Sequence, residues 1–106
     1  MLFYDFEAGN KAYKLRLNTR NIVQLEKVLG CNPLSIFGTG DTIPPVTTMV
    51  AILHASLQQY HHSITLEAAY AIFDEYLEEH AMTDFLEVIV EVYKVSGLMK
   101  VDSEKN

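Results

Sequence analysis

At 106 residues, of which 49% are hydrophobic, the chain is long enough for one modest hydrophobic core but not for two. The net charge of −6 and the lack of a basic stripe argue against nucleic acid and against an anionic membrane surface as partners. No apolar run reaches the ~18 residues of a membrane span, and the first residues lack the pattern of a signal peptide. The single cysteine cannot form an internal disulfide. A cytoplasmic protein is therefore expected.

The first predicted element is a β-hairpin over residues 2–17. Gly9 and Asn10 are typical of a two-residue turn with glycine first. Pairing about this turn places six apolar residues on one face, as the pairs Tyr4–Leu15, Phe6–Tyr13 and Leu2–Leu17. The opposite face pairs Asp5 with Lys14. A lone hairpin is marginal in water, so its apolar face must pack on the helices, on a partner's hairpin or on both.

A helix is predicted to follow, with Asn18 or Thr19 as its cap and Gly30 just past its end. Its apolar stripe consists of Ile22, Leu25, Val28 and Leu29. Asn32 and Pro33 then start a short helical turn that offers three residues to the core, namely Leu34, Ile36 and Phe37. The single cysteine, Cys31, is interpreted as a small residue in this tight corner, because no general base is signalled nearby.

Residues 38–44, GTGDTIP, are predicted to be a connector, since they lack the GK[ST] ending and the preceding strand of a phosphate-binding loop. Three further helices are expected. The first begins at Pro45 and runs to about His61. The second is capped by Thr65 and runs to about His80, and the third is capped by Thr83 and ends near Gly97. The inward faces of the first two are predicted to hold Val46, Met49, Val50, Leu53, Leu57 and Tyr60, and Leu66, Ala69, Tyr70, Phe73, Tyr76 and Leu77.

The last helix, FLEVIVEVYKV, has only three polar residues, Glu87, Glu91 and Lys94, which share one face. Its other sides are apolar, which implies burial on most of them. The predicted fold is therefore α+β, mostly α: an N-terminal β-hairpin followed by about four helical segments. Residues 1–98 are expected to form a single domain, and residues 99–106 a flexible tail.

Two groups of ionisable residues could carry chemistry. His54 and His61 are seven residues apart, which is a poor spacing for one metal ion, so they are interpreted as helix-end histidines favoured by the helix dipole. A second group consists of four acids on the outer side of their helix: Asp74, Glu75, Glu78 and Glu79. This group is either a solubilising surface or an electrostatic footprint for a basic partner. Neither group supports an enzyme.

The candidate protein-binding residues are these four acids together with apolar residues of the last helix, namely Phe85, Ile89 and Tyr93. The apolar last helix and the hairpin offer more apolar surface than one small domain is expected to bury. A homo-oligomer, at least a dimer, is therefore predicted. No catalytic, metal-binding or cofactor-binding residue is predicted.

The runs LRLNTRNIVQLEKVLGCNPLSIF, from Leu15, and PPVTTMVAILHASLQ resemble the tail assembly chaperones of long-tailed bacteriophages. The resemblance covers residues 15 to about 98. Its most specific feature is the LGxNPL corner at Leu29 to Leu34, in which Cys31 takes the variable position. The strand that enters a capped helix and the proline-started helix with a V-x-x-M-V-x-x-L stripe complete it.

The resemblance implies a non-enzymatic protein of the host bacterial cytoplasm that binds the tape-measure protein, promotes tail-tube assembly and is absent from the finished virion. Many members of that family are also made in a longer form by ribosomal frameshifting. Glu104, Lys105 and Asn106 have A-rich codons, and Lys105 with Asn106 would allow a run of adenines in the gene; an ordinary polar tail is the alternative interpretation of these residues. The alternative is a structural connector or tail-completion protein retained in the virion. An enzyme, the third possibility, would need a cleft with perturbed titrating groups.

Overall fold

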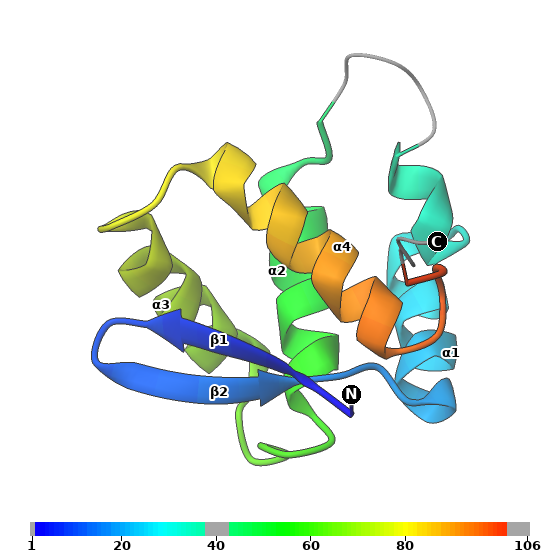
Figure 1. Cartoon of the computed structure of the whole chain (residues 1–106), viewed down its shortest axis with the longest axis horizontal. Coiled ribbons are helices and arrows are strands. Elements are labelled where there is room, and N and C mark those ends of the chain that lie inside the picture. The colour runs from blue at the N-terminus through cyan, green and yellow to red at the C-terminus, as the bar shows by residue number, and fades with distance from the viewer. Residues whose placement is uncertain (1, 38–42, 102–106) are drawn as a thin grey trace.

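The computed structural model describes residues 2–37 and 43–101 (Figure 1). Most of the predicted connector 38–44 and the tail residues 102–106, with the frameshift candidates among them, lie outside the described residues. In chain order the elements are β1 (Tyr4–Ala8), β2 (Lys11–Leu15), α1 (Thr19–Leu29), the 3-10 helix η1 (Pro33–Phe37), α2 (Val46–Leu57), α3 (Leu66–Leu77), the 3-10 helix η2 (Met82–Asp84) and α4 (Phe85–Val95). The predicted class, α+β and mostly α with an N-terminal hairpin, is confirmed.

Helix α2 is the centre of the fold and contacts α1, α3, α4 and β2. Figure 1 shows α4 crossing in front of α2, with the hairpin and α3 on one side and α1 on the other. The residues that α2 buries lie on most of its sides, as this central position requires: Met49, Val50, Ile52, Leu53, Ala55, Ser56 and Leu57. One hydrophobic core therefore serves the whole domain.

The hairpin has the predicted antiparallel register, with Tyr4 opposite Leu15 and Asp5 opposite Lys14. Gly9 begins the turn with φ 63°, a left-handed conformation that glycine adopts without strain. The predicted pair of Leu2 with Leu17 does not share a buried face. Leu17 is fully buried, whereas Leu2 precedes β1 and is 66% exposed.

The caps of α1 follow the prediction. The Asn18 side chain accepts the Asn21 N–H at 2.8 Å, and Gly30 has φ 73°. The predicted core stripe is only partly right, because Leu25 is buried but Val28 is 71% exposed. Val28 instead lines a concave surface among α1, α2 and α3.

The corner after α1 is fixed by polar contacts and one buried proline. The Asn32 carboxamide oxygen accepts the Leu34 N–H at 2.9 Å. Pro33 is buried, and its carbonyl oxygen accepts a hydrogen bond of 3.0 Å from the Tyr93 hydroxyl of α4. Leu34 and Phe37 were both expected in the core, but each remains more than a third exposed. Cys31 is exposed, with its thiol free.

The later helices are shorter than predicted. Helix α2 ends at Leu57 and α3 at Leu77, and their last turns tighten to i→i+3 hydrogen bonds, such as the Glu78 N–H to the Glu75 carbonyl at 3.2 Å. Thr65 caps α3 as predicted. Thr83 does not cap the last helix. Instead the Asp84 carboxylate accepts the Ala81 N–H at 2.9 Å and starts η2, which leads into α4.

Candidate functional site

The four predicted acids lie together on the solvent side of α3 and just beyond its end: Asp74, Glu75, Glu78 and Glu79. All four are exposed, so they are available to a partner. Glu75 also lies over the hairpin turn, since a Cβ on Gly9 would be 3.0 Å from the Glu75 carboxylate oxygen. We refer to these four residues as the acidic face.

The three apolar candidates of α4 have a different position. Phe85, Ile89 and Tyr93 are each no more than 1% exposed. Phe85 packs edge-on against Phe6 of the hairpin, with ring centroids 5.9 Å apart. Because α4 lies between the hairpin and α2, its apolar side belongs to the core of the same chain. In this fold these three residues cannot contact a partner.

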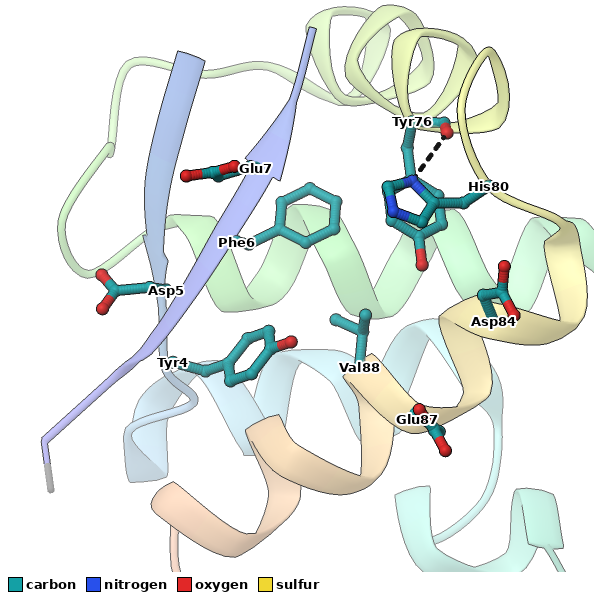
Figure 2. Close-up of a pocket in the computed structure, with 9 residues that line it drawn as sticks. All are labelled: Tyr4, Asp5, Phe6, Glu7, Tyr76, His80, Asp84, Glu87 and Val88. Atoms are coloured by element: carbon teal, nitrogen blue, oxygen red, sulfur yellow. Dashed lines mark hydrogen bonds between the residues drawn. The ribbon is translucent and has the colours of Figure 1, made fainter. Parts of the chain in front are cut away.

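A cleft that the sequence did not predict lies between β1, α3 and α4, with a volume of about 550 Å³ (Figure 2). Its lining is Tyr4, Asp5, Phe6, Glu7, Tyr76, His80, Asp84, Glu87 and Val88. Figure 2 shows that the Asp5 and Glu7 side chains turn away from the cleft, whereas Tyr4 and Phe6 turn into it. This follows from the alternation of side chains along a strand, so β1 presents the backbone of Asp5 and Glu7 to the cleft.

Aromatic rings form one wall of the cleft. Tyr76 and His80, one turn apart at the end of α3, stack with ring centroids 4.3 Å apart and planes 9° apart. Tyr76 is only 4% exposed. Burial, followed by the charges of Asp84 and Glu87, raises the pKa of Tyr76 to about 12. Burial and nearby carboxylates also raise the pKa of Tyr4. Both hydroxyls therefore remain protonated at neutral pH.

The negative charge of the cleft lies beside these rings. Asp84 and Glu87 are exposed and belong to η2 and to the first turn of α4. Asp84 uses one carboxylate oxygen for the Ala81 N–H. The lining includes no lysine or arginine. Two carboxylates, two neutral hydroxyls and aromatic rings can accept hydrogen bonds from a cationic group and stack on it.

A second concave surface is an apolar groove among α1, α2 and α3, with a volume of about 350 Å³. Its lining is Gln24, Leu25, Val28, Thr47, Ala51, His54, Ala55, Gln58, Leu66 and Tyr70. Val28, Leu66 and Tyr70 are exposed at 71%, 43% and 40%, although all three were predicted to lie in the core. The groove thus gathers part of the exposed apolar surface of the described residues, whereas the apolar side of α4 is buried.

The histidines were weighed as metal ligands in the sequence. In residues 2–37 and 43–101, no three His, Cys, Asp or Glu side chains are placed to share a metal ion. His54 lies in the last turn of α2 and His61 follows the end of that helix, as interpreted, but burial lowers the pKa of both, which opposes their charged form. The His61 Nε2 accepts the backbone N–H of Lys14 at 2.9 Å, which requires that nitrogen to be unprotonated. His61 thus attaches the loop after α2 to strand β2.

Among the helices described, none has the length and apolar character needed to cross a membrane. Searches of curated proteins and of solved structures gave no match to the sequence. One family matches residues 4–106, and it is described as a family of unknown function, DUF6096. Since the match spans nearly the entire sequence, the chain belongs to the DUF6096 family.

Proposed function

We propose that the chain is a non-enzymatic assembly chaperone that binds the tape-measure protein of a phage-like tail and promotes tail-tube assembly in the host cytoplasm. The observation that carries this proposal is the apolar groove, in which Val28, Leu66 and Tyr70 remain exposed. Exposed apolar surface of this kind is typical of protein-binding sites. The groove runs between helices, so it suits the apolar face of an amphipathic helix.

The acidic face supports the same proposal by a second route. It places two exposed carboxylates on α3, the helix that also contributes Leu66 and Tyr70 to the groove, and two more just beyond the end of that helix. A negative surface beside an apolar groove speeds the encounter with a basic helical segment, while the apolar contacts retain it. The choice of tape-measure and tail-tube proteins as partners comes from the resemblance at the LGCNPL corner.

Coexpression with the tape-measure protein of the same genome tests the proposal. The wild-type chain should keep the tape-measure protein soluble and should copurify with it. Val28→Glu should abolish copurification, because it puts a charge in the groove. Val23→Glu is the matched control, since Val23 lies on α1 outside the groove and is 44% exposed. Both variants should retain the fold, as substitutions at exposed sites usually change stability by about 0.5 kcal/mol or less.

Two results would refute the proposal. One is a gene neighbourhood without tape-measure and tail-tube genes. The other is copurification that Val28→Glu and Val23→Glu reduce equally. Detection of the chain in purified particles would instead favour a connector or completion protein retained in the virion.

A further inference from the structure

Strand β1 has a free edge, and the hydrogen bonds of β2 show which of its backbone groups lie there. Lys14 is the register partner of Asp5, yet its N–H donates to the His61 Nε2 and not to Asp5. The Asp5–Lys14 pair is therefore a non-hydrogen-bonded pair. Such pairs alternate with hydrogen-bonded ones in an antiparallel ladder, so Glu7–Ala12 is also of this type. The N–H and C=O groups of Asp5 and Glu7 consequently point away from β2.

These groups point to the side of the cleft. The described sheet consists of two strands, and its order, β1-β2, leaves no strand beside the outer edge of β1. Within residues 2–37 and 43–101, no hydrogen bond outside the β1–β2 ladder is found for the backbone of Asp5 or Glu7. Both residues line the cleft although their side chains turn away from it, so it is this unpaired backbone that the cleft exposes (Figure 2). An unpaired edge of this kind is a template for another strand.

Tyr76 adds a hydrogen-bonding group to the cleft. Its side chain is 96% buried, since only 4% is exposed, and Figure 2 shows its hydroxyl directed into the cleft. In the described part of the chain this hydroxyl has no hydrogen-bond partner, and its oxygen remains accessible to solvent in the cleft. The Tyr76 hydroxyl is therefore available for a group that enters the cleft.

The charges define the chemistry of that group. Asp84 faces the cleft from η2 and Glu87 from α4, and among the described residues the lining has no lysine or arginine. The stacked rings of Tyr76 and His80 offer a flat aromatic surface beside these carboxylates. A guanidinium or ammonium group would satisfy the hydroxyl and the carboxylates together, and arginine suits the flat wall best.

We propose that the free edge of β1 binds an extended segment of a partner protein as a third strand, and that this segment places an arginine side chain in the cleft against Tyr76, Asp84 and Glu87. Strand addition supplies main-chain hydrogen bonds through Asp5 and Glu7, and the cleft supplies the side-chain specificity. The inference goes beyond the proposed function and does not depend on it, because it concerns a different surface from the groove.

The probe is an acetylated and amidated peptide, Thr-Val-Thr-Arg-Thr-Val-Thr, titrated from micromolar to near-millimolar concentration against the isotope-labelled chain. Amide hydrogen exchange at Asp5 and Glu7 should slow by about tenfold or more when the peptide is bound, since each new main-chain hydrogen bond must open before exchange. The Phe6 amide, which already pairs with Tyr13, is the internal reference. Unchanged exchange at Asp5 and Glu7 at saturation, or no binding, would overturn the proposal.

Two peptide variants separate strand addition from mere charge attraction. N-methylation of the residues on one side of the peptide backbone should abolish binding, and N-methylation of the alternate residues should be tolerated. Equal effects of the two patterns would exclude a third strand. Replacement of the arginine by glutamine should weaken binding about tenfold, because hydrogen bonds to charged groups are lost.

Protein variants place the arginine in the cleft. Tyr76→Phe keeps the ring packing, and Glu87→Gln keeps the side-chain shape; each should weaken binding of the arginine peptide several-fold and leave the glutamine peptide unchanged. Glu79→Gln, on the acidic face and outside the cleft, is the matched control. An equal effect of Glu79→Gln and Glu87→Gln would refute the cleft assignment. A last control omits the peptide. If hydrogen exchange at the Asp5 and Glu7 amides then slows as the protein concentration rises, the edge of β1 pairs with a second copy of the chain, and the proposal of a segment from a different protein is refuted.

Discussion

Removal of one hydroxyl group should reveal how the LGCNPL corner is held. Tyr93 is fully buried on α4, and its hydroxyl donates to the Pro33 carbonyl oxygen at 3.0 Å, a contact between residues sixty positions apart. Tyr93→Phe keeps the ring, and with it the edge-on contact to Phe37 at 5.8 Å. The variant thus removes one hydrogen bond and little else, and it leaves the buried Pro33 carbonyl without this donor.

The expected loss follows from that geometry. A buried acceptor that loses its partner costs about 1–3 kcal/mol, since it is also hidden from water. We expect Tyr93→Phe to reduce the free energy of unfolding by about 1.5 kcal/mol. For a domain of this size, each 1 kcal/mol lowers the melting temperature by roughly 4–8 °C.

Urea unfolding followed by circular dichroism measures this quantity, with an unchanged m-value as the sign that only stability has changed. Tyr70→Phe is the matched control, because Tyr70 is 40% exposed and its hydroxyl makes no hydrogen bond within the described residues. That control should stay within about 0.5 kcal/mol of wild type. If Tyr93→Phe is no less stable than Tyr70→Phe, the Pro33 contact does not hold the corner, and the burial of Pro33 alone must account for it.

Three further outcomes are expected. Gly30→Ala should lower the free energy of unfolding, measured by chemical denaturation, by about 1–2 kcal/mol, because Gly30 has φ 73°. A Cβ at this position would meet nothing within 4 Å, so the loss would come from backbone strain, and an unchanged free energy of unfolding would contradict this. Burial and Lys14 lower the pKa of His61 below 6.5, so the unfolded chain binds more protons than the folded chain, and the free energy of unfolding should fall as pH decreases below about 6.5. The His61→Gln variant should show a shallower dependence on pH, and the part that remains should come from His54, whose pKa burial also lowers. Neutralising the acidic face should slow association with a basic partner and leave circular dichroism unchanged, whereas association that is independent of salt would assign binding to the groove.

Local chemistry predicted the ends of several elements correctly. The turn at Gly9, the caps at Asn18 and Thr65 and the helix stop at Gly30 were all recognised from the sequence. Each of these features depends on hydrogen bonds or backbone angles within a few residues, so the neighbouring sequence determines it. The hairpin register was also predictable, because a two-residue turn and one apolar face leave a single consistent pairing.

The location of the exposed apolar surface could not be predicted in this way. Val28 and Leu66 have helical spacing to buried neighbours, but a helix buries only the residues that face its actual partners. The cleft is further removed from sequence reasoning, since Tyr4, Tyr76 and Asp84 come from three elements and have no common spacing. The one available signal was the alternation along β1, which placed Tyr4 and Phe6 on the inner face.

Self-association remains a prediction, and the structure moves its expected location. The sequence assigned the surplus apolar surface to the last helix and the hairpin, but Phe85, Ile89 and Tyr93 are buried within their own chain. The apolar groove, with Val28 at its rim, is the concave surface left for a second copy when no other partner is present. We expect at least a dimer by light scattering in the micromolar to near-millimolar range, and we expect Val28→Glu to shift the mass towards the monomer while Val23→Glu does not. A monomer mass at every concentration would refute self-association and leave the groove open to a different partner.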